Sequence, residues 1–269
     1  FYFVAGLLIM AGLGLFLFTS AAGRVWCGYA CPQTVWTDLF ILVERWVEGD
    51  RNARLRLHRS KWNGEKIRKT AVKWSAWLLI AVATGGAWVF YFTDAPTLFH
   101  DLLHGTAHPA AYITMAILTA TTFFFGGFAR EQICIYACPW PRIQAAMMDE
   151  DTITIGYRSW RGEPRGKQSV ETSGDCIDCM ACVNVCPMGI DIRDGLQYQC
   201  IGCALCIDAC DSIMEKLDKP KGLIRYTTEN NLEGKKTHIM RPRLFGYAAV
   251  LLTMMGALTY TIATRTPFQ

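Results

Sequence analysis

The sequence is poor in charge, and its few charged residues leave four long stretches empty. Asp, Glu, Lys and Arg make up 19% of the 269 residues, below the roughly 25% of an ordinary globular domain. None of them occurs in residues 1–23, 74–93, 102–129 or 244–264. As a helix, each stretch would cover the roughly 30 Å of a bilayer's hydrocarbon core. The pattern excludes a disordered chain and a disulfide-held miniprotein, and it predicts a membrane protein with four transmembrane helices.

Lysine and arginine are missing from one loop altogether. Residues 94–109 contain none, whereas all but one of the 27 lie in residues 24–73 and 130–243, the exception being Arg265. The positive-inside rule then predicts that the two basic segments face the cytoplasm. Helix one therefore runs from outside to inside, and we expect a further N-terminal segment to precede it.

No cysteine stands outside a closely spaced motif, which favours metal ligands in a reducing compartment over disulfides. Eight of the twelve form two copies of C-x2-C-x2-C-x3-C, at residues 176–186 and 200–210. Bacterial ferredoxins hold two 4Fe–4S clusters with this spacing, each copy lending its fourth cysteine to the other cluster. We predict one cluster on Cys176, Cys179, Cys182 and Cys210, and a second on Cys200, Cys203, Cys206 and Cys186. Zinc, which usually takes separated C-x2-C pairs or Cys mixed with His, fits poorly.

The remaining four cysteines form two C-x3-C-P motifs, Cys27–Cys31 and Cys134–Cys138. Each motif follows an inward-running helix, a glycine and an arginine. Thiols at i and i+4 of a helical turn face the same way, so the two pairs are expected to form a four-sulfur site at the cytoplasmic helix ends. Copper, whose reduced ion is soft, is the leading metal. A further iron–sulfur cluster, a redox dithiol and buried structural thiols are the alternatives.

Apolar residues recur at helical spacing after Cys31, where Pro32 suits the first turn of a helix. They are Val35, Trp36, Leu39, Phe40, Val43, Trp46 and Val47, and Glu44 lies off the stripe. This pattern predicts a helix lying along the inner headgroups, with an ordinary core helix as the alternative. The basic residues from 51 to 73 favour contact with anionic lipid over nucleic acid, because they join two membrane segments.

These patterns together predict an α-helical membrane protein with a small α+β bacterial-type dicluster ferredoxin domain on its cytoplasmic side. In chain order we expect transmembrane helix 1 (1–23), an interfacial helix and basic loop with the first C-x3-C-P (24–73), transmembrane helices 2 and 3 with a short outer loop (74–129), a cytoplasmic connector with the second C-x3-C-P (130–169), the dicluster ferredoxin domain (170–243), transmembrane helix 4 (244–264) and an outer tail (265–269).

Blocks of residues spread over almost the whole chain resemble the CcoG family, also called FixG or RdxA. This family comprises iron–sulfur accessory proteins of cbb-type cytochrome oxidase assembly. The matching blocks are C-G-Y-A-C-P-Q-T-V-W-T-D-L-F at 27–40, V-E-R-W-V-E-G-D-R at 43–51, T-G-G-A-W-V-F-Y-F-T-D-A-P-T-L at 84–98, F-G-G-F-A-R-E-Q-I-C-I-Y-A-C-P-W-P-R at 125–142, R-G-E-P-R-G at 161–166, G-I-D-I-R-D-G-L-Q at 189–197 and C-I-G-C-A-L-C-I-D-A-C-D at 200–211. Asp211, where the ferredoxin pattern has proline, also looks like the family's own form.

The resemblance implies a copper(II) reductase of the bacterial inner membrane that supplies copper(I) to a haem–copper oxidase. Its partners would be the copper ion, an unidentified cytoplasmic electron donor and oxidase assembly factors. Family members also carry a periplasmic immunoglobulin-like domain beyond the last helix, where this chain stops at Gln269.

Two other functions stay open. One is a polyferredoxin conduit to a quinone or respiratory partner, as in the more distant nitrate and nitrous-oxide accessory proteins. The absence of charge from the four spans speaks mildly against a quinone, whose sites tend to leave polar residues at membrane depth. The other is a non-enzymatic copper-binding assembly factor.

Anaerobically purified protein is expected to contain iron and acid-labile sulfide, because the duplicated cysteine spacing is that of 4Fe–4S ligands. Metal analysis and a sulfide assay on the same sample test this expectation. Zinc without labile sulfide would contradict the cluster prediction, and labelling of residues 176–210 from outside the cell would contradict the topology.

Overall fold

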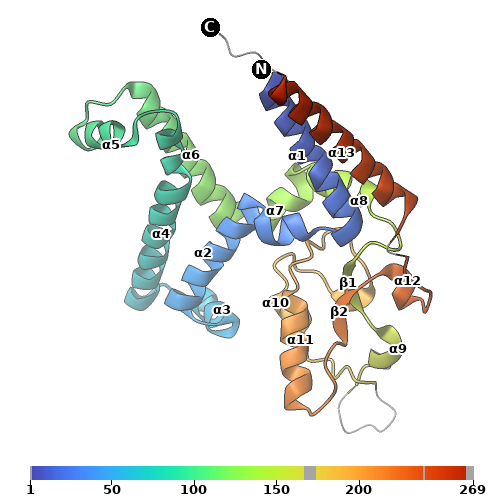
Figure 1. Cartoon of the computed structure of the whole chain (residues 1–269). Coiled ribbons are helices and arrows are strands. Elements are labelled where there is room, and N and C mark those ends of the chain that lie inside the picture. The colour runs from blue at the N-terminus through green and yellow to red at the C-terminus, as the bar shows by residue number, and fades with distance from the viewer. Residues whose placement is uncertain (1, 167–173, 239, 265–269) are drawn as a thin grey trace. The chain divides into compact units, whose positions relative to one another are not determined.

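The computed structural model describes residues 2–166, 174–238 and 240–264, and it divides into two compact units (Figure 1). Unit 1 is Phe1–Ala30 with Ala137–Gln269, and unit 2 is Cys31–Tyr136. The expected outer tail, 265–269, and residues 170–173 of the expected ferredoxin domain lie outside the described residues.

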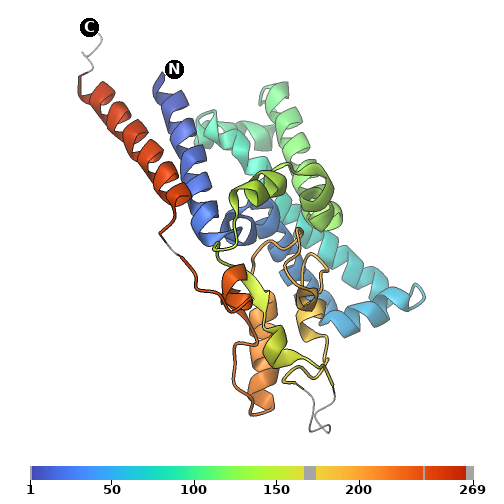
Figure 2. The same ribbon diagram turned by 90° about the vertical axis from the view of Figure 1, so that its right-hand side faces the viewer.

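Unit 1 combines two long helices with a small α+β region. Its helices are α1 (Tyr2–Ala22), η1 (Trp26–Ala30), α8 (Trp140–Met147), α9 (Ser159–Gly162), α10 (Ala181–Val185), η5 (Ile192–Asp194), α11 (Leu205–Lys216), α12 (Glu229–Leu232) and α13 (Pro242–Ala263), and its strands are β1 (Thr154–Tyr157) and β2 (Ile224–Thr227). The helices α1 and α13 run side by side in both views (Figures 1 and 2).

Unit 2 is helical throughout its described elements. They are α2 (Pro32–Glu48), α3 (Arg51–Arg59), α4 (Gly64–Thr84), η2 (Gly86–Tyr91), α5 (Ala95–His104), α6 (Pro109–Phe124), η3 (Phe125–Ala129), α7 (Arg130–Gln132) and η4 (Ile133–Ala137). Helices α4 and α6 pack against each other, and α2 packs against α4.

Four helical stretches among the described residues are long and apolar enough to cross a membrane. They are Phe3–Ala22, Gly64–Tyr91, Pro109–Ala137 and Pro242–Ala263. Each contains most of one charge-free stretch of the sequence, as expected from length and composition. The second begins ten residues or so before the charge-free stretch, because the end of the expected basic loop is already helical: Asn63 caps α4 by accepting a hydrogen bond from the Lys66 amide at 2.8 Å.

The apolar stripe expected on α2 is divided between core and surface. Phe40 is fully buried and stacks on Trp77 of α4, with ring centroids 5.1 Å apart. The Trp77 indole N–H also donates to the Phe40 carbonyl at 3.2 Å. Trp46, in contrast, is 79% exposed. One side of α2 is therefore an ordinary packing face, and the exposed tryptophan is available to a lipid headgroup layer.

The small α+β region of unit 1 is held by an antiparallel pair of short strands. Thr154 pairs with Thr227 and Tyr157 with Ile224. The core beneath them contains apolar side chains and cysteines, namely Ile155, Tyr157, Cys176, Cys182, Ile192, Cys210, Met214, Leu223 and Ile224. Strand β1 comes from the expected connector, so this segment shares a sheet and a core with the eight-cysteine region.

A buried carboxylate joins three elements of unit 2. Glu44, on α2, is 3% exposed, although it lies off the apolar stripe. Its oxygens meet Nη2 of Arg130 at 2.5 Å and Nη2 of Arg54 at 2.6 Å. A buried acid is tolerated when basic partners satisfy it, and removing one member leaves the others uncompensated.

Replacing Glu44 with Ala is expected to destabilise the protein by about 1–3 kcal/mol, less than for a fully buried pair because both arginines are partly exposed. The matched control is Glu65→Ala, whose carboxylate pairs with Lys69 at 2.8 Å but is 57% exposed, and which should leave stability unchanged. Thermal unfolding in detergent at fixed protein concentration measures both. Equal unfolding temperatures for the two variants would refute the role of Glu44.

Candidate metal centres

One group of cysteines surrounds a cavity beneath α10 and α11. Its lining contains Cys176, Cys179, Cys182 and Cys210, together with Tyr157, Arg193 and the apolar side chains Ile177, Met180, Ile213, Met214, Leu223 and Ile224. Three of the four cysteines come from one loop and the start of α10, and Cys210 comes from α11. The structure thus brings together the four residues that the spacing assigns to one cluster.

A second group surrounds a neighbouring cavity. Its lining contains Cys186, Cys200, Cys203 and Cys206, together with Cys182 and the apolar side chains Ile155, Pro187, Met188, Ile190, Ile192 and Ile201. Cys186, the last cysteine of the first motif, therefore lies with the loop of the second motif. Cys210 does the reverse, so the fourth cysteines cross over as the ferredoxin pattern requires.

The two cysteine loops repeat the same backbone conformation. Asp178 and Met180 have positive φ angles of 54° and 58°, and the corresponding Gly202 and Ala204 have 72° and 64°. Left-handed φ costs about 1 kcal/mol or more in a residue other than glycine. Its recurrence at matching motif positions indicates that both loops are shaped to wrap a centre of the same kind.

Burial makes negative charge on these sulfurs costly. Burial raises the pKa of Cys206 and of Cys210 to about 12, with neighbouring cysteines adding to the effect. Burial also raises the pKa of Cys182 and Cys200. Thiolates gathered in such cavities need nearby cations. Among the described residues no three His, Cys, Asp or Glu side chains converge as on a single ion. The cysteines that line each cavity suit a polynuclear iron–sulfur group, which takes four thiolate ligands.

The membrane-proximal cysteines occupy two similar turns. Cys27 lies in η1 and Cys134 in η4, each at the second residue of a five-residue π-helix, and Cys31 and Cys138 follow directly after these turns. Such π turns occur often at functional sites. Cys27 and Cys138 belong to unit 1, and Cys31 and Cys134 to unit 2. The expected four-sulfur site stays a prediction.

The sulfur of Cys27 is held by a buried polar group. Cys27 is 9% exposed, and its Sγ donates to Oε1 of Gln144 at 3.0 Å. Gln144, on α8, is fully buried, and its Nε2 donates to the Thr19 hydroxyl of α1 at 3.3 Å. The orientation of this thiol is therefore coupled to two helices of unit 1.

Residues next to Cys27 contact the loop of the second cysteine group. The Tyr29 hydroxyl donates to the Cys203 carbonyl at 3.1 Å, and Arg24 donates to the carbonyls of Tyr198 and Cys200. A Cβ on Gly28 would lie 2.9 Å from the Ile201 carbonyl oxygen. The turn that carries Cys27 thus packs directly on the backbone of residues 201–203. Sequence reasoning assigned no role to Gly28 or Tyr29, and their place inside C-G-Y-A-C-P was the available signal.

A cavity of about 350 Å³ adjoins this junction. Its lining includes Ala22 at the end of α1, Arg24, Cys200, Tyr198 and Tyr226. Cavities of this size accommodate small ligands. It gives a small molecule access to the loop that carries Cys200.

Two family descriptions match most of this cysteine-bearing sequence. Residues 129–229 match a 4Fe-4S dicluster domain, and residues 3–51 match a 4Fe-4S binding domain. The first match includes β1 and all eight ferredoxin-type cysteines, and the second includes Cys27 and Cys31. The matches, with the many cysteines, support iron–sulfur clusters as the polynuclear groups.

Curated proteins similar to the chain share most of its length. Protein RdxB of Cereibacter sphaeroides is 70% identical over 283 aligned residues, covering 100% of the chain and 59% of RdxB. Protein RdxA of the same organism is 74% identical over 226 residues, covering 84% of the chain and 48% of RdxA. Nitrogen fixation protein FixG of Rhizobium meliloti is 62% identical over 234 residues, covering 85% of the chain and 45% of FixG.

The chain spans about half the length of these relatives. No solved structure matches it. The match to RdxB covers the whole chain at 70% identity, so the similarity reaches well beyond a shared ferredoxin pattern. Because its close relatives are RdxB, RdxA and FixG and it carries the dicluster domain, the chain belongs to the CcoG/FixG/RdxA family.

Proposed function

We propose that the protein is a membrane-bound iron–sulfur electron-transfer protein that reduces copper(II) to copper(I) for assembly of a cbb-type haem–copper oxidase. The observation that carries this proposal is the contact between the Cys27 turn and the loop of the second cysteine group, through Gly28 and Tyr29. It supplies a short covalent and hydrogen-bonded connection from a cluster loop to a thiol outside the clusters.

The eight ferredoxin-type cysteines hold the clusters in this proposal. Cys176, Cys179, Cys182 and Cys210 bind the first cluster, and Cys200, Cys203, Cys206 and Cys186 the second. The two cavities lined by these sets support the assignment. A 4Fe–4S cluster supplies a one-electron carrier, and the buried apolar walls keep water from its sulfurs.

Copper is the substrate at the membrane-proximal thiols. Cys27, Cys31, Cys134 and Cys138 receive copper(II), which takes up one electron and becomes copper(I). Reduction converts a borderline cation into a soft one, which thiolate ligands prefer. The buried Gln144 beside Cys27 keeps the thiol oriented before the metal arrives.

The orientation follows from charge. The basic segments 24–73 and 130–243 support a ferredoxin region on the cytoplasmic side of a bacterial inner membrane. An electron donor in the cytoplasm reduces the clusters, and the copper(I) product passes to oxidase assembly factors.

A conduit to a quinone is the second candidate, and the 350 Å³ cavity beside Cys200 favours it. The cavity lies at the end of α1 rather than within a membrane span. The lack of charged residues in the spans therefore does not argue against a quinone at this cavity. Its lining places the rings of Tyr198 and Tyr226 and the carboxylates of Asp149, Glu150 and Glu229 around the space. An uncharged ring suits this lining better than a phosphate-bearing cofactor.

Replacing Cys27 and Cys134 together with Ser should abolish copper(II) reduction while leaving the visible absorbance of the clusters intact. The hydroxyl is a poor ligand for copper(I), whereas the eight cluster cysteines are untouched. A copper(I)-specific chelator measures turnover, and bleaching of the clusters by dithionite is the control. Unchanged turnover in the double variant would eliminate the assigned copper site and leave the quinone conduit as the better function.

Substituting Gly28 with Ala is expected to destabilise the protein by about 1–3 kcal/mol, because the added Cβ meets backbone atoms that cannot move alone. It should also slow copper(II) reduction, since the Cys27 turn is pushed off the cluster loop. Gly12→Ala is the matched control: a Cβ there meets nothing within 4 Å. Thermal unfolding and the copper(I) assay test both variants, and equal behaviour of the pair would refute the contact's role.

A further inference from the structure

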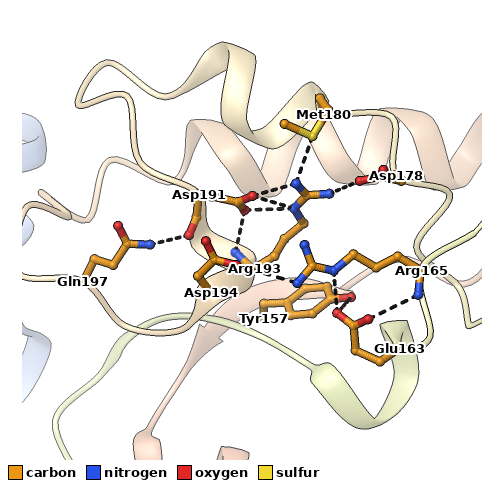
Figure 3. A network of polar contacts seen from close by, with 9 residues as sticks. All are labelled: Tyr157, Glu163, Arg165, Asp178, Met180, Asp191, Arg193, Asp194 and Gln197. Atoms are coloured by element: carbon orange, nitrogen blue, oxygen red, sulfur yellow. Dashed lines mark hydrogen bonds and ion pairs between the residues drawn. The ribbon is translucent and has the colours of Figure 1, made fainter.

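The first cluster cavity has a buried arginine in its wall. The Arg193 side chain is 5% exposed, and it lines the cavity with Cys176, Cys179, Cys182 and Cys210. Its guanidinium donates to Asp191, to Asp178 at 2.5 Å and to the Met180 sulfur at 2.9 Å (Figure 3). These partners hold the guanidinium at one place in the cavity wall.

Asp191 positions this arginine in two ways. Its Oδ1 accepts the Arg193 backbone N–H at 2.9 Å, which caps η5, and its carboxylate also accepts Nε at 2.8 Å. Asp191 and Asp178 largely neutralise the charge of Arg193 at long range. Any effect of Arg193 on the cluster therefore acts mainly at contact distance.

Two side chains with N–H or O–H groups line the cavity together with Cys176. They are Arg193 and Tyr157. Tyr157 is 6% exposed, and its hydroxyl donates to Oε1 of Glu163 at 3.2 Å. Figure 3 shows the ring of Tyr157 next to the Arg165–Glu163 pair.

The second cavity has a different lining. Apart from its cysteines, the residues around it are apolar: Ile155, Pro187, Met188, Ile190, Ile192 and Ile201. Arg24 approaches this loop, but its hydrogen bonds there go to the carbonyl oxygens of Tyr198 and Cys200. The two cavities therefore share a ligand pattern and differ in the donors offered to sulfur.

Reduction adds a negative charge to a cluster, so donors to its sulfurs stabilise the reduced form and raise its potential. We infer that Arg193, positioned by Asp191, and Tyr157 raise the midpoint potential of the cluster on Cys176, Cys179, Cys182 and Cys210 above that of the other cluster. This inference rests on the proposed cluster ligands and is independent of copper reduction.

One ligand of the same cluster is exposed, and its other three are buried. Cys179 is the one exposed cysteine of the twelve, all of which lie in the described parts of the chain. A cluster that combines an exposed ligand with the higher potential is the first to hold an electron delivered by a one-electron donor.

Redox titration of the full chain in detergent, followed by electron paramagnetic resonance, tests the inference. The wild-type protein should show two one-electron components with different midpoint potentials, and Cys203→Ser identifies the component of the second cluster. Arg193→Met should lower the potential of the other component and leave that of the second cluster in place. Arg193→Lys, which keeps a donor and the charge, should lower it less.

Arg165→Met is the matched control. Arg165 belongs to the same polar network, with its Nε 2.6 Å from Glu163, but it does not line the cavity. It should leave both potentials near their wild-type values. If Arg165→Met and Arg193→Met give the same shift, the effect is one of general charge and the contact inference is wrong.

Tyr157→Phe provides a second test that remains informative if Arg193→Met misfolds and loses iron. It removes one hydroxyl and keeps the ring in the core, and it should lower the same midpoint potential. Unchanged potentials in Tyr157→Phe and in cluster-loaded Arg193→Met would overturn the inference. Cluster content unaffected by replacing Cys176 would instead overturn the ligand assignment, so the two failures are distinguishable.

Discussion

The need to compensate buried sulfur charge organises the small α+β region of unit 1. Cys182 and Cys210 belong to its core, and burial raises the pKa of both thiols. Without nearby cations, burial favours the neutral thiol form of these cysteines. With metal, thiolate ligation connects two loops, α10 and α11, so that binding free energy becomes folding free energy. Asp178 and Met180 adopt left-handed backbone conformations, which are unfavourable for residues other than glycine. This conformational free energy is the local cost of wrapping the loop around a centre.

The same region is joined to a membrane helix by polar contacts. Arg241, before α13, is paired with Asp149 and donates to the Ser20 carbonyl at 2.9 Å. Thr152 donates to the same carbonyl at 3.1 Å. These bonds satisfy backbone groups where α1 ends at Ala22, which would otherwise be unpaired. They fix the position of η1, and with it the Cys27 turn, on the loop of the second cysteine group.

Unit 2 is stabilised differently, by aromatic packing and one buried carboxylate. Phe40 and Trp77 form its core with Ala81, and the missing Cβ atoms at Gly126 and Gly127 let η3 approach them. Glu44 then ties α2 to Arg130 beside η3. Cys31 directly precedes α2, and Cys134 lies in η4.

The sequence alone was sufficient for the features that depend on periodicity and spacing. Charge-free stretches predict membrane-spanning helices because a bilayer requires mainly sufficient length and apolar side chains. The duplicated cysteine motif predicts the two groups of cluster cysteines because most of the ligands of each cluster lie close together in the sequence. Strand β1 was not predictable, since four residues containing a glycine carry no alternation. Neither was Glu44, whose burial depends on Arg54 and Arg130 from other helices. The placement of Arg193 in the wall of the first cavity, and of Gly28 against Ile201, depends on how separate segments of the chain pack together. Such contacts leave no local pattern, so only the tertiary structure decided them.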